Sequence, residues 1–334
     1  MTAVEFEDVL EPGLEIIDAH HHLWGPGVPW EPSTYLLDDF AADLETGHRV
    51  TATVYVECHS RYRPDGPAEL RPVGETEFAV AVAAAAAARG IATRIAAGIV
   101  AHADLTVGDA IDAVLDAHEE AGKGRLRGIR HMVAPPLHKP AEDPGLLRDP
   151  GFRRGLARLA AHGLSFEVYA LQTQLGDVVA AAQAVPELTF VIDHLGGIFG
   201  LGELAGRHNE LWPRWRADIV ALSRLQNTYL KLSGLGTEYA GFGWHERRTP
   251  PSSAQIADET RKYYAHAIEC FGVRRCLFAS NFPPDRLAGS YRTLWNVFKR
   301  IADGCSRDEK AALFHGTAAA LYRLSSADTA WATA

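Results

Sequence analysis

The sequence is poor in the features that build disulfide frameworks and membrane spans. Only four cysteines occur among 334 residues, with no Cys-x-x-Cys pair, which disfavours a disulfide scaffold and a thiolate zinc site. No apolar stretch reaches the roughly 18 residues that cross a bilayer. Residues 1–5 lack the basic and then apolar layout of a secretory signal. We therefore expect a cytoplasmic protein without a membrane partner.

Positive charge is also in deficit. The formal net charge is −9 at pH 7, whereas nucleic-acid and anionic-membrane partners require a basic face. No Gly-x-Gly-x-x-Gly fingerprint follows the first apolar run, which disfavours a dinucleotide-binding fold. A small-molecule substrate is therefore the expected partner. The sequence leaves self-association into a homo-oligomer open.

Short β-branched apolar runs alternate with longer helical patterns along the chain. Eight runs predict strands at residues 14–20, 50–57, 91–100, 126–131, 164–169, 188–194, 228–233 and 275–280. Helical patterns occupy residues 75–89, 109–121, 152–162, 175–185, 212–225, 255–271, 291–302 and 306–323, with a short helix expected near 36–46. Repeated strand–helix units predict a parallel sheet of the α/β class. Eight units favour a closed (β/α)8 TIM barrel over an open doubly wound sheet.

The chain shows no sign of division into parts. It has no linker, no repeat at fixed period and no low-complexity segment beyond the alanine run at 83–88, which suits a helix. We therefore expect a single domain over residues 1–334, with the barrel core at about 14–324 and a flexible tail at 325–334.

A histidine triplet lies where the first predicted strand ends. Side chains alternate faces along an extended strand, so His20 and His22 should point one way and His21 the other. Two imidazoles on one face of a rigid element suit a borderline divalent cation. The triplet therefore predicts part of a metal site, with a chance cluster as the plainer alternative.

Other ionisable residues gather at the ends of later predicted strands. In a (β/α)8 barrel the chemistry lies at the carboxyl ends of the strands. Any one of these residues alone would more often be structural, but their shared placement favours a functional site. The candidates at these ends are Glu57, Arg130, Asp193, His194, Lys231, Asn281 and Asp285.

Five segments, in order and spread over nearly the whole chain, resemble the amidohydrolase superfamily. They are IDAHHHLW at 17–24, LRGIRH at 126–131, VIDHLG at 191–196, KLSGL at 231–235 and SNFP at 280–283. The branch they resemble most contains L-fuconolactonase and 2-pyrone-4,6-dicarboxylate lactonase. The resemblance implies a (β/α)8 barrel with a hydrolytic site, often around a divalent metal. It would make His20, His22 and His194 metal ligands and Asp193 an orienting residue.

The eighth-strand motif departs from the family pattern. The family commonly has Ser-Asp-Trp-Pro, whose aspartate binds metal and accepts a proton from the attacking water, whereas this chain has Asn281 at that position. A neutral amide is no base, and it is a poorer ligand than a carboxylate. Three alternatives stay open: Glu57 replaces the aspartate, Asp285 folds back to do so, or the site works without a metal. We favour Glu57, against the plainer alternative that it pairs with Arg61 or Arg130.

The loops at the expected mouth of the barrel combine cationic side chains with aromatic rings. Guanidinium groups bind carboxylates in bidentate geometry, and aromatic rings suit a planar or ring-shaped ligand. The plainer alternatives are that Arg61 and Arg63 are solvated and that Lys231 pairs with a carboxylate. The expected substrate contacts are Arg130, Arg61, Arg63, Tyr169, Trp24, Phe282 and Lys231.

Together these patterns predict a metal-assisted hydrolase of a small, carboxylated cyclic substrate such as a lactone. A zinc or manganese ion held by His20, His22, His194 and Glu57 would activate water. Glu57 or Asp285 would accept the proton, while Asn281 and Arg130 position the substrate. Three alternatives stay open: a metal-independent lactonase with His194 as base, a non-oxidative decarboxylase of an aromatic acid, and a weakly or non-catalytic relative that binds a small molecule.

Overall fold

A computed structural model describes residues 7–26, 28, 33–135 and 144–324 of the chain. The tail predicted at 325–334 lies outside the described residues. Within the described ranges, no helix combines the length and the apolar character that a membrane span needs.

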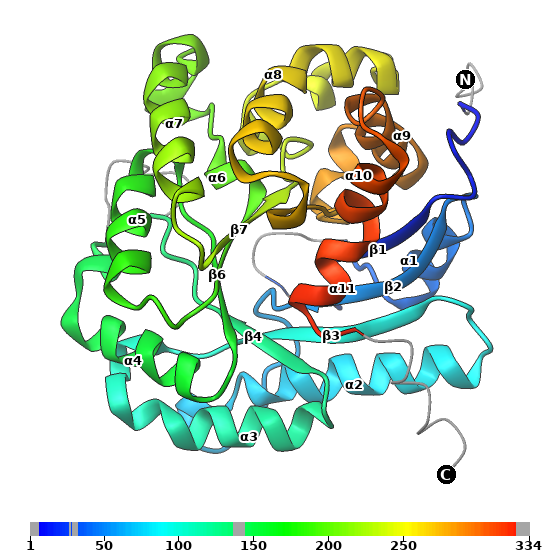
Figure 1. Ribbon diagram of the computed structural model, residues 1–334. Coiled ribbons are helices and arrows are strands. Elements are labelled where there is room, and N and C mark those ends of the chain that lie inside the picture. The colour runs from blue at the N-terminus through cyan, green and yellow to red at the C-terminus, as the bar shows by residue number, and fades with distance from the viewer. Residues whose placement is uncertain (1–6, 27, 29–32, 136–143, 325–334) are drawn as a thin grey trace.

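Eight parallel strands form one sheet in chain order and confirm the predicted (β/α)8 barrel (Figure 1). Beyond the last strand, the Asn281 N–H donates to the His20 carbonyl and the His22 N–H to the Phe282 carbonyl, each at 2.8 Å. These two bonds join the first and last strands and close the ring. The strands are β1 Glu15–His21, β2 Arg49–Val56, β3 Arg94–His102, β4 Leu126–Arg130, β5 Ser165–Val168, β6 Phe190–Ile192, β7 Thr228–Leu232 and β8 Cys276–Phe278.

Helices surround the barrel (Figure 1). The alanine run at 83–88 lies in the second of them, as helix propensity predicts. The fourth begins after Asp149, whose side chain accepts from the Phe152 N–H at 2.8 Å as an N-cap. The helices are α1 Leu37–Leu44, α2 Val73–Ala88, α3 Asp112–Gly122, α4 Pro150–Ala161, α5 Leu175–Ala184, α6 His194–Gly197, α7 His208–Ser223, α8 Ser253–Phe271, α9 Tyr291–Ile301, α10 Arg307–Ala311 and α11 Thr317–Leu321.

The helix predicted over 306–323 changes its hydrogen-bonding pattern in the middle. A π-helical turn at Ala312–Gly316 separates α10 from α11. The turn contains Gly316, a residue type that weakens an α-helix. The predicted helix is therefore confirmed over residues 307–321, with a π-helical turn in its middle that the sequence pattern did not indicate.

The end of the described chain covers the amino-terminal end of the barrel. Tyr322 and Leu324 pack in one buried cluster with interior strand residues such as Ile17 and Val54. Arg127, at the start of β4, donates to the Tyr322 carbonyl, and Arg323 donates to the Gly163 carbonyl just before β5 at 3.1 Å. With one end of the barrel covered, the carboxyl ends of the strands are left to form a site.

Candidate active site

A cavity of about 320 Å³ opens at the carboxyl ends of the strands. This volume lies at the lower end of the range for small-molecule sites, about 300–1,000 Å³. Its polar wall includes His22, Arg130, His194 and Asn281, which follow or end four different strands. Its apolar wall includes Trp24, Met132, Tyr169, Ile198 and Tyr239.

His20 and His22 face each other at the end of β1. Their Nε2 atoms are 3.0 Å apart, and His22 Nδ1 donates to the Val56 carbonyl at 2.7 Å. A carbonyl can only accept, so His22 carries its proton on Nδ1 and keeps a lone pair on Nε2. His21 points away from both and stacks on Phe40, with ring centroids 4.3 Å apart.

Burial keeps the imidazoles of the site neutral. It lowers the pKa of His22 to about 3 and that of His194 to about 4. Burial, followed by the positive charge of Lys231, holds the pKa of His20 well below its ordinary range. Neutral imidazole is the form that binds a metal cation.

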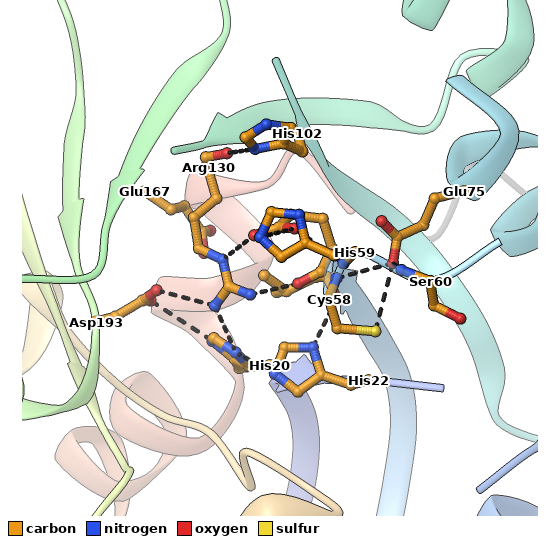
Figure 2. A network of polar contacts seen from close by, with 12 residues as sticks. His20, His22, Cys58, His59, Ser60, Glu75, His102, Arg130, Glu167 and Asp193 are labelled. Atoms are coloured by element: carbon orange, nitrogen blue, oxygen red, sulfur yellow. Dashed lines mark hydrogen bonds and ion pairs between the residues drawn. The ribbon is translucent and has the colours of Figure 1, made fainter. Parts of the chain in front are cut away.

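Asp193 belongs to a buried group of ionisable residues, and Figure 2 shows it directed toward Arg130 and His20. Its Oδ1 lies 3.5 Å from His20 Nδ1 and 3.4 Å from Lys231 Nζ, and its Oδ2 lies 3.6 Å from Arg130 Nη1. Burial opposes ionisation, but Lys231 and His20 outweigh it and hold the pKa of Asp193 well below its usual range. Among the described residues neither oxygen has a hydrogen-bond partner. Such buried acceptors are costly unless they meet a donor or a cation.

The donor set around His20 suits a divalent cation. His20, Asp193 and His194 each offer a ligand atom within 4.8 Å of the others. Zinc binds imidazole nitrogen and carboxylate oxygen at about 2.0–2.2 Å, and Asp193, whose oxygens lack a hydrogen-bond partner among the described residues, offers the carboxylate. The sequence placed Glu57 among the ligands instead. In the structure the carboxylate beside these histidines is that of Asp193.

Glu57 and Arg130 form a buried ion pair. Arg130 Nε donates to Glu57 Oε1 at 2.7 Å, and Nη2 binds the Glu57 carbonyl. Burial opposes the charge of Glu57, but Arg130, aided by His59 and His102, outweighs it and lowers the pKa of Glu57 to about 2. A carboxylate so stabilised is a weak base. The pairing matches the plainer alternative that the sequence left open for Glu57.

Asn281 is held by the carboxylate of Asp285. Asn281 Nδ2 donates to Asp285 Oδ1 at 2.8 Å, and the Gly234 N–H donates to Asp285 Oδ2 at 3.0 Å. Because an ionised carboxylate only accepts, the amide nitrogen faces Asp285 and the amide oxygen is left for another partner. Burial raises the pKa of Asp285 to about 7. Asp285 is not among the residues that line the cavity, so it acts on the site through Asn281.

His194 and Lys231 lie at different distances from the cavity. His194 lines the cavity, and its Nδ1 is 2.9 Å from Ser233 Oγ. Lys231 is fully buried below the cavity, where Nζ binds Glu167 and lies 3.1 Å from His20 Nδ1. Lys231 therefore contacts the site through His20, and the structure places it with a carboxylate.

Besides Lys231, three predicted substrate contacts lie away from the cavity wall. The Arg61 guanidinium lies 5.4 Å from the centre of the Phe78 ring, and Arg63 pairs with Glu77 of α2. Phe282 is buried against Tyr291. Of the other predicted contacts, Trp24, Tyr169 and Arg130 line the cavity.

Several residues near the cavity escaped sequence reasoning. His102 was missed because the third predicted strand stopped at residue 100, two residues short of it. Glu167 was missed because the residues around it match no motif, although it lies within the strand predicted at residues 164–169. No local signal marks the apolar wall, since Met132, Ile198 and Tyr239 meet only when distant loops fold together.

Comparison with known proteins gives this geometry a context. The amidohydrolase family model matches residues 17–324. A Sinorhizobium fredii protein named uncharacterized protein y4mH is 31% identical over 337 residues, covering 93% of this chain and 99% of that protein. An L-fucono-1,5-lactonase of Burkholderia ambifaria is 27% identical over 324 residues, covering 92% and 95%.

A solved structure of an amidohydrolase is also similar to this chain. The crystal structure of an amidohydrolase from Burkholderia multivorans with bound zinc has a TM-score of 0.72 and 28% identity, covering 93% of this chain and 99% of that one. The family match spans the barrel and the cavity together. The chain therefore belongs to the amidohydrolase family, as its motifs predicted, and it is a hydrolase.

Proposed function

We propose that this protein hydrolyses a lactone in the cavity at the carboxyl ends of its strands. The observation that carries the proposal is the convergence of His22, Arg130, His194 and Asn281 on one cavity. The similarity to an L-fucono-1,5-lactonase supports the reaction class. In the reaction, water attacks the lactone carbonyl carbon, the bond from that carbon to the ring oxygen breaks, and a hydroxy acid forms.

His194 is the proposed base. Its neutral imidazole lines the cavity, whereas Glu57 is bound by Arg130 and Asp285 lies behind Asn281. Burial weakens the imidazole as a base, but the adjacent charge of Asp193 favours the imidazolium that forms. The proton taken from water then passes from His194 to the ring oxygen as that oxygen leaves.

Two further residues act on the reacting atoms. The Asn281 amide oxygen accepts a hydrogen bond from the attacking water, because its nitrogen is committed to Asp285. The positive charge of Arg130 stabilises the oxyanion that develops on the carbonyl oxygen. With His194 acting as the base, His20 and Asp193 of the donor set would hold a divalent cation, zinc first and manganese second, together with His22, whose Nε2 lies 3.0 Å from His20 Nε2. A bound cation supplies a Lewis acid and lowers the pKa of water.

The residues that line the cavity indicate which kind of lactone it can bind. The sequence predicted a carboxylated ring. Among the described lining residues the one guanidinium is that of Arg130, which already binds Glu57 and approaches Asp193. We propose that the lactone ring lies against Trp24 and Tyr169 and does not require a carboxylate of its own.

A lactone panel tests this function. Acid release from neutral 1,5-lactones, sugar lactones and 2-pyrone-4,6-dicarboxylate is followed with a pH indicator in the wild type, His194→Asn and His162→Asn. His162 is the matched control, because it lies at the end of α4 beside Asp112 and Glu119. We expect His194→Asn to lower kcat/KM by about 10²–10⁴-fold and His162→Asn to leave it unchanged.

Other results of these assays would contradict the proposal or distinguish between its alternatives. No turnover of any lactone, or equal rates in both histidine variants, contradicts the proposal. Full activity in Glu57→Gln supports the choice of His194 over Glu57 as base. Release of carbon dioxide from aromatic acids without any lactone turnover would instead indicate the decarboxylase alternative.

A further inference from the structure

We propose a second divalent cation site at the rim of the cavity, formed by Glu57, His59 and His102, here called the rim triad. Glu57 and His59 directly follow β2, and His102 ends the neighbouring strand β3. Each of the three offers a ligand atom within 4.8 Å of the other two. Two imidazoles and one carboxylate form a ligand set that suits zinc and similar borderline cations.

Hydrogen bonds orient both histidines of the rim triad. His102 Nδ1 lies 3.1 Å from the Arg130 carbonyl, and because a carbonyl only accepts, the proton of His102 sits on Nδ1 and the lone pair on Nε2. His59 Nδ1 lies 2.8 Å from the Tyr62 hydroxyl. A partner on Nδ1 that fixes the ring is the usual arrangement for a histidine that binds metal through Nε2.

The spacing of the ligand atoms fits a shared cation. His59 Nε2 lies 3.7 Å from Glu57 Oε2, which is too long for a hydrogen bond. Two ligands on a tetrahedral ion with bonds of about 2.1 Å are about 3.4 Å apart. A shift of a few tenths of an ångström would therefore bring both atoms onto one ion.

The two oxygens of Glu57 serve different partners. Oε1 accepts from Arg130 at 2.7 Å, while Oε2 faces His59. A cation at the rim triad would thus be separated from the guanidinium by the carboxylate. The repulsion is reduced further because Arg130 Nη1 also lies 3.6 Å from Asp193 on its other side.

The rim triad is distinct from the donor set around His20. Figure 2 shows the Arg130 guanidinium between His59 on one side and Asp193 and His20 on the other. The same guanidinium binds Glu57 of the rim triad. His59 lines the cavity and its side chain is 31% exposed, so the remaining coordination positions of the cation can meet solvent or substrate. A cation there would bind a carboxylate or hydroxyl oxygen of a ligand in the cavity.

Zinc binding to chelator-treated protein tests the rim triad by titration calorimetry and elemental analysis. His131 provides the matched control, since its ring lies 5.3 Å from that of His102 but it belongs to no ligand group of the described residues. To remove the other donor set, the comparison is made in His20→Asn/His22→Asn protein. We expect this protein to retain one equivalent of zinc, with binding weakened at least about tenfold by His102→Gln and unchanged by His131→Gln.

The proposal fails if the His20→Asn/His22→Asn protein binds no zinc, or if His102→Gln and His131→Gln bind it equally well. Should the doubly substituted protein not fold, single His102→Gln and His131→Gln variants are compared with the wild type. His102→Gln alone should then lose one equivalent of zinc, and equal stoichiometry in both would overturn the site. These outcomes are separate from lactone turnover, so the proposed function can stand or fall independently.

Discussion

The hydrogen bonds of His20 determine how a cation can enter the site. Lys231 Nζ lies 3.1 Å from His20 Nδ1 and, as an ammonium group, can only donate. His20 therefore carries its proton on Nε2 and donates it to His22 Nε2, 3.0 Å away. A cation bound through both Nε2 atoms must displace that proton.

Zinc binding between His20 and His22 should therefore release about one proton at this pair. The measurement is titration calorimetry in buffers that differ in ionisation enthalpy, using His102→Gln protein so that the rim triad does not contribute. A heat independent of the buffer would contradict the assigned proton positions. Lys231→Met, which removes the donor to Nδ1, should reduce the release.

Asp285 should give the activity a dependence on pH near neutrality. Its pKa of about 7 means that the carboxylate holds Asn281 Nδ2 above this pH, while the protonated acid below it can turn the amide around. We expect kcat/KM to rise with pH through about 7 and Asp285→Asn to flatten the rise. His22 and His194, with pKa values of about 3 and 4, stay neutral in this window.

The same carboxyl group links folding to pH. Its pKa is raised in the folded protein from the ordinary value of 3.8 to about 7, so between about pH 4 and 7 the folded state keeps a proton that the unfolded chain has lost. This contribution to stability therefore falls as pH rises through that window. A steeper fall in Asp285→Asn than in the wild type would contradict the assignment.

Placing an aspartate at position 281, where the motif resemblance led us to expect one, should create a like-charge pair. In Asn281→Asp two carboxylates would face each other where the amide nitrogen now lies 2.8 Å from Asp285 Oδ1, so one of them must stay protonated. We expect the Tm of this variant to fall more steeply than that of the wild type between pH 6 and 9. The Asn281→Asp/Asp285→Asn double variant, which restores an amide beside a carboxylate, should recover the wild-type slope.

At the scale of elements, the segment after α11 stabilises the amino-terminal end of the barrel. The Tyr322 hydroxyl donates to Glu167 Oε1 at 2.5 Å, and Glu167 in turn binds Lys231. Tyr322→Phe leaves a buried acceptor with one partner fewer and should cost about 1–3 kcal/mol of unfolding free energy. Tyr322→Ala adds a cavity and should cost about 3–5 kcal/mol.

Urea denaturation measures both losses. Tyr229→Phe is the control, because Tyr229 packs against the same cluster and only its hydroxyl is removed. Equal stability in Tyr322→Phe and Tyr229→Phe would show that the bond to Glu167 contributes nothing.

The strands were predictable because each is a short apolar run with its own local signal, and all eight lie within a few residues of their predicted positions. The histidine pair was predictable for the same reason, since strand alternation brings His20 and His22 together. The choice between Arg61 and Arg130 as partner of Glu57 was not predictable, because Arg130 lies 73 positions away from Glu57 along the chain. The ion pairs of Asp193 with Lys231 and Arg130 were not predictable for the same reason. Sequence spacing carries no information about which carboxylate a buried guanidinium will reach.

At the scale of the whole molecule, ring closure ties every strand to two neighbours. No strand can leave without breaking hydrogen bonds to two neighbours, so we expect the barrel to unfold as one unit. Far-ultraviolet circular dichroism and tryptophan fluorescence should report the same urea midpoint. Separate midpoints would indicate parts of the chain that unfold independently.

The bond between the Asn281 N–H and the His20 carbonyl makes closure of the ring and alignment of the site one and the same event. In a mutational library at residues 280–283, active variants would therefore be limited to those that still close the barrel, whatever their effect on the reaction. Ile198 and Tyr239 lie on the apolar wall of the cavity and take no part in ring closure, so their substitution should leave the assembly of the barrel intact. That wall is where altered ligand preference should evolve most readily.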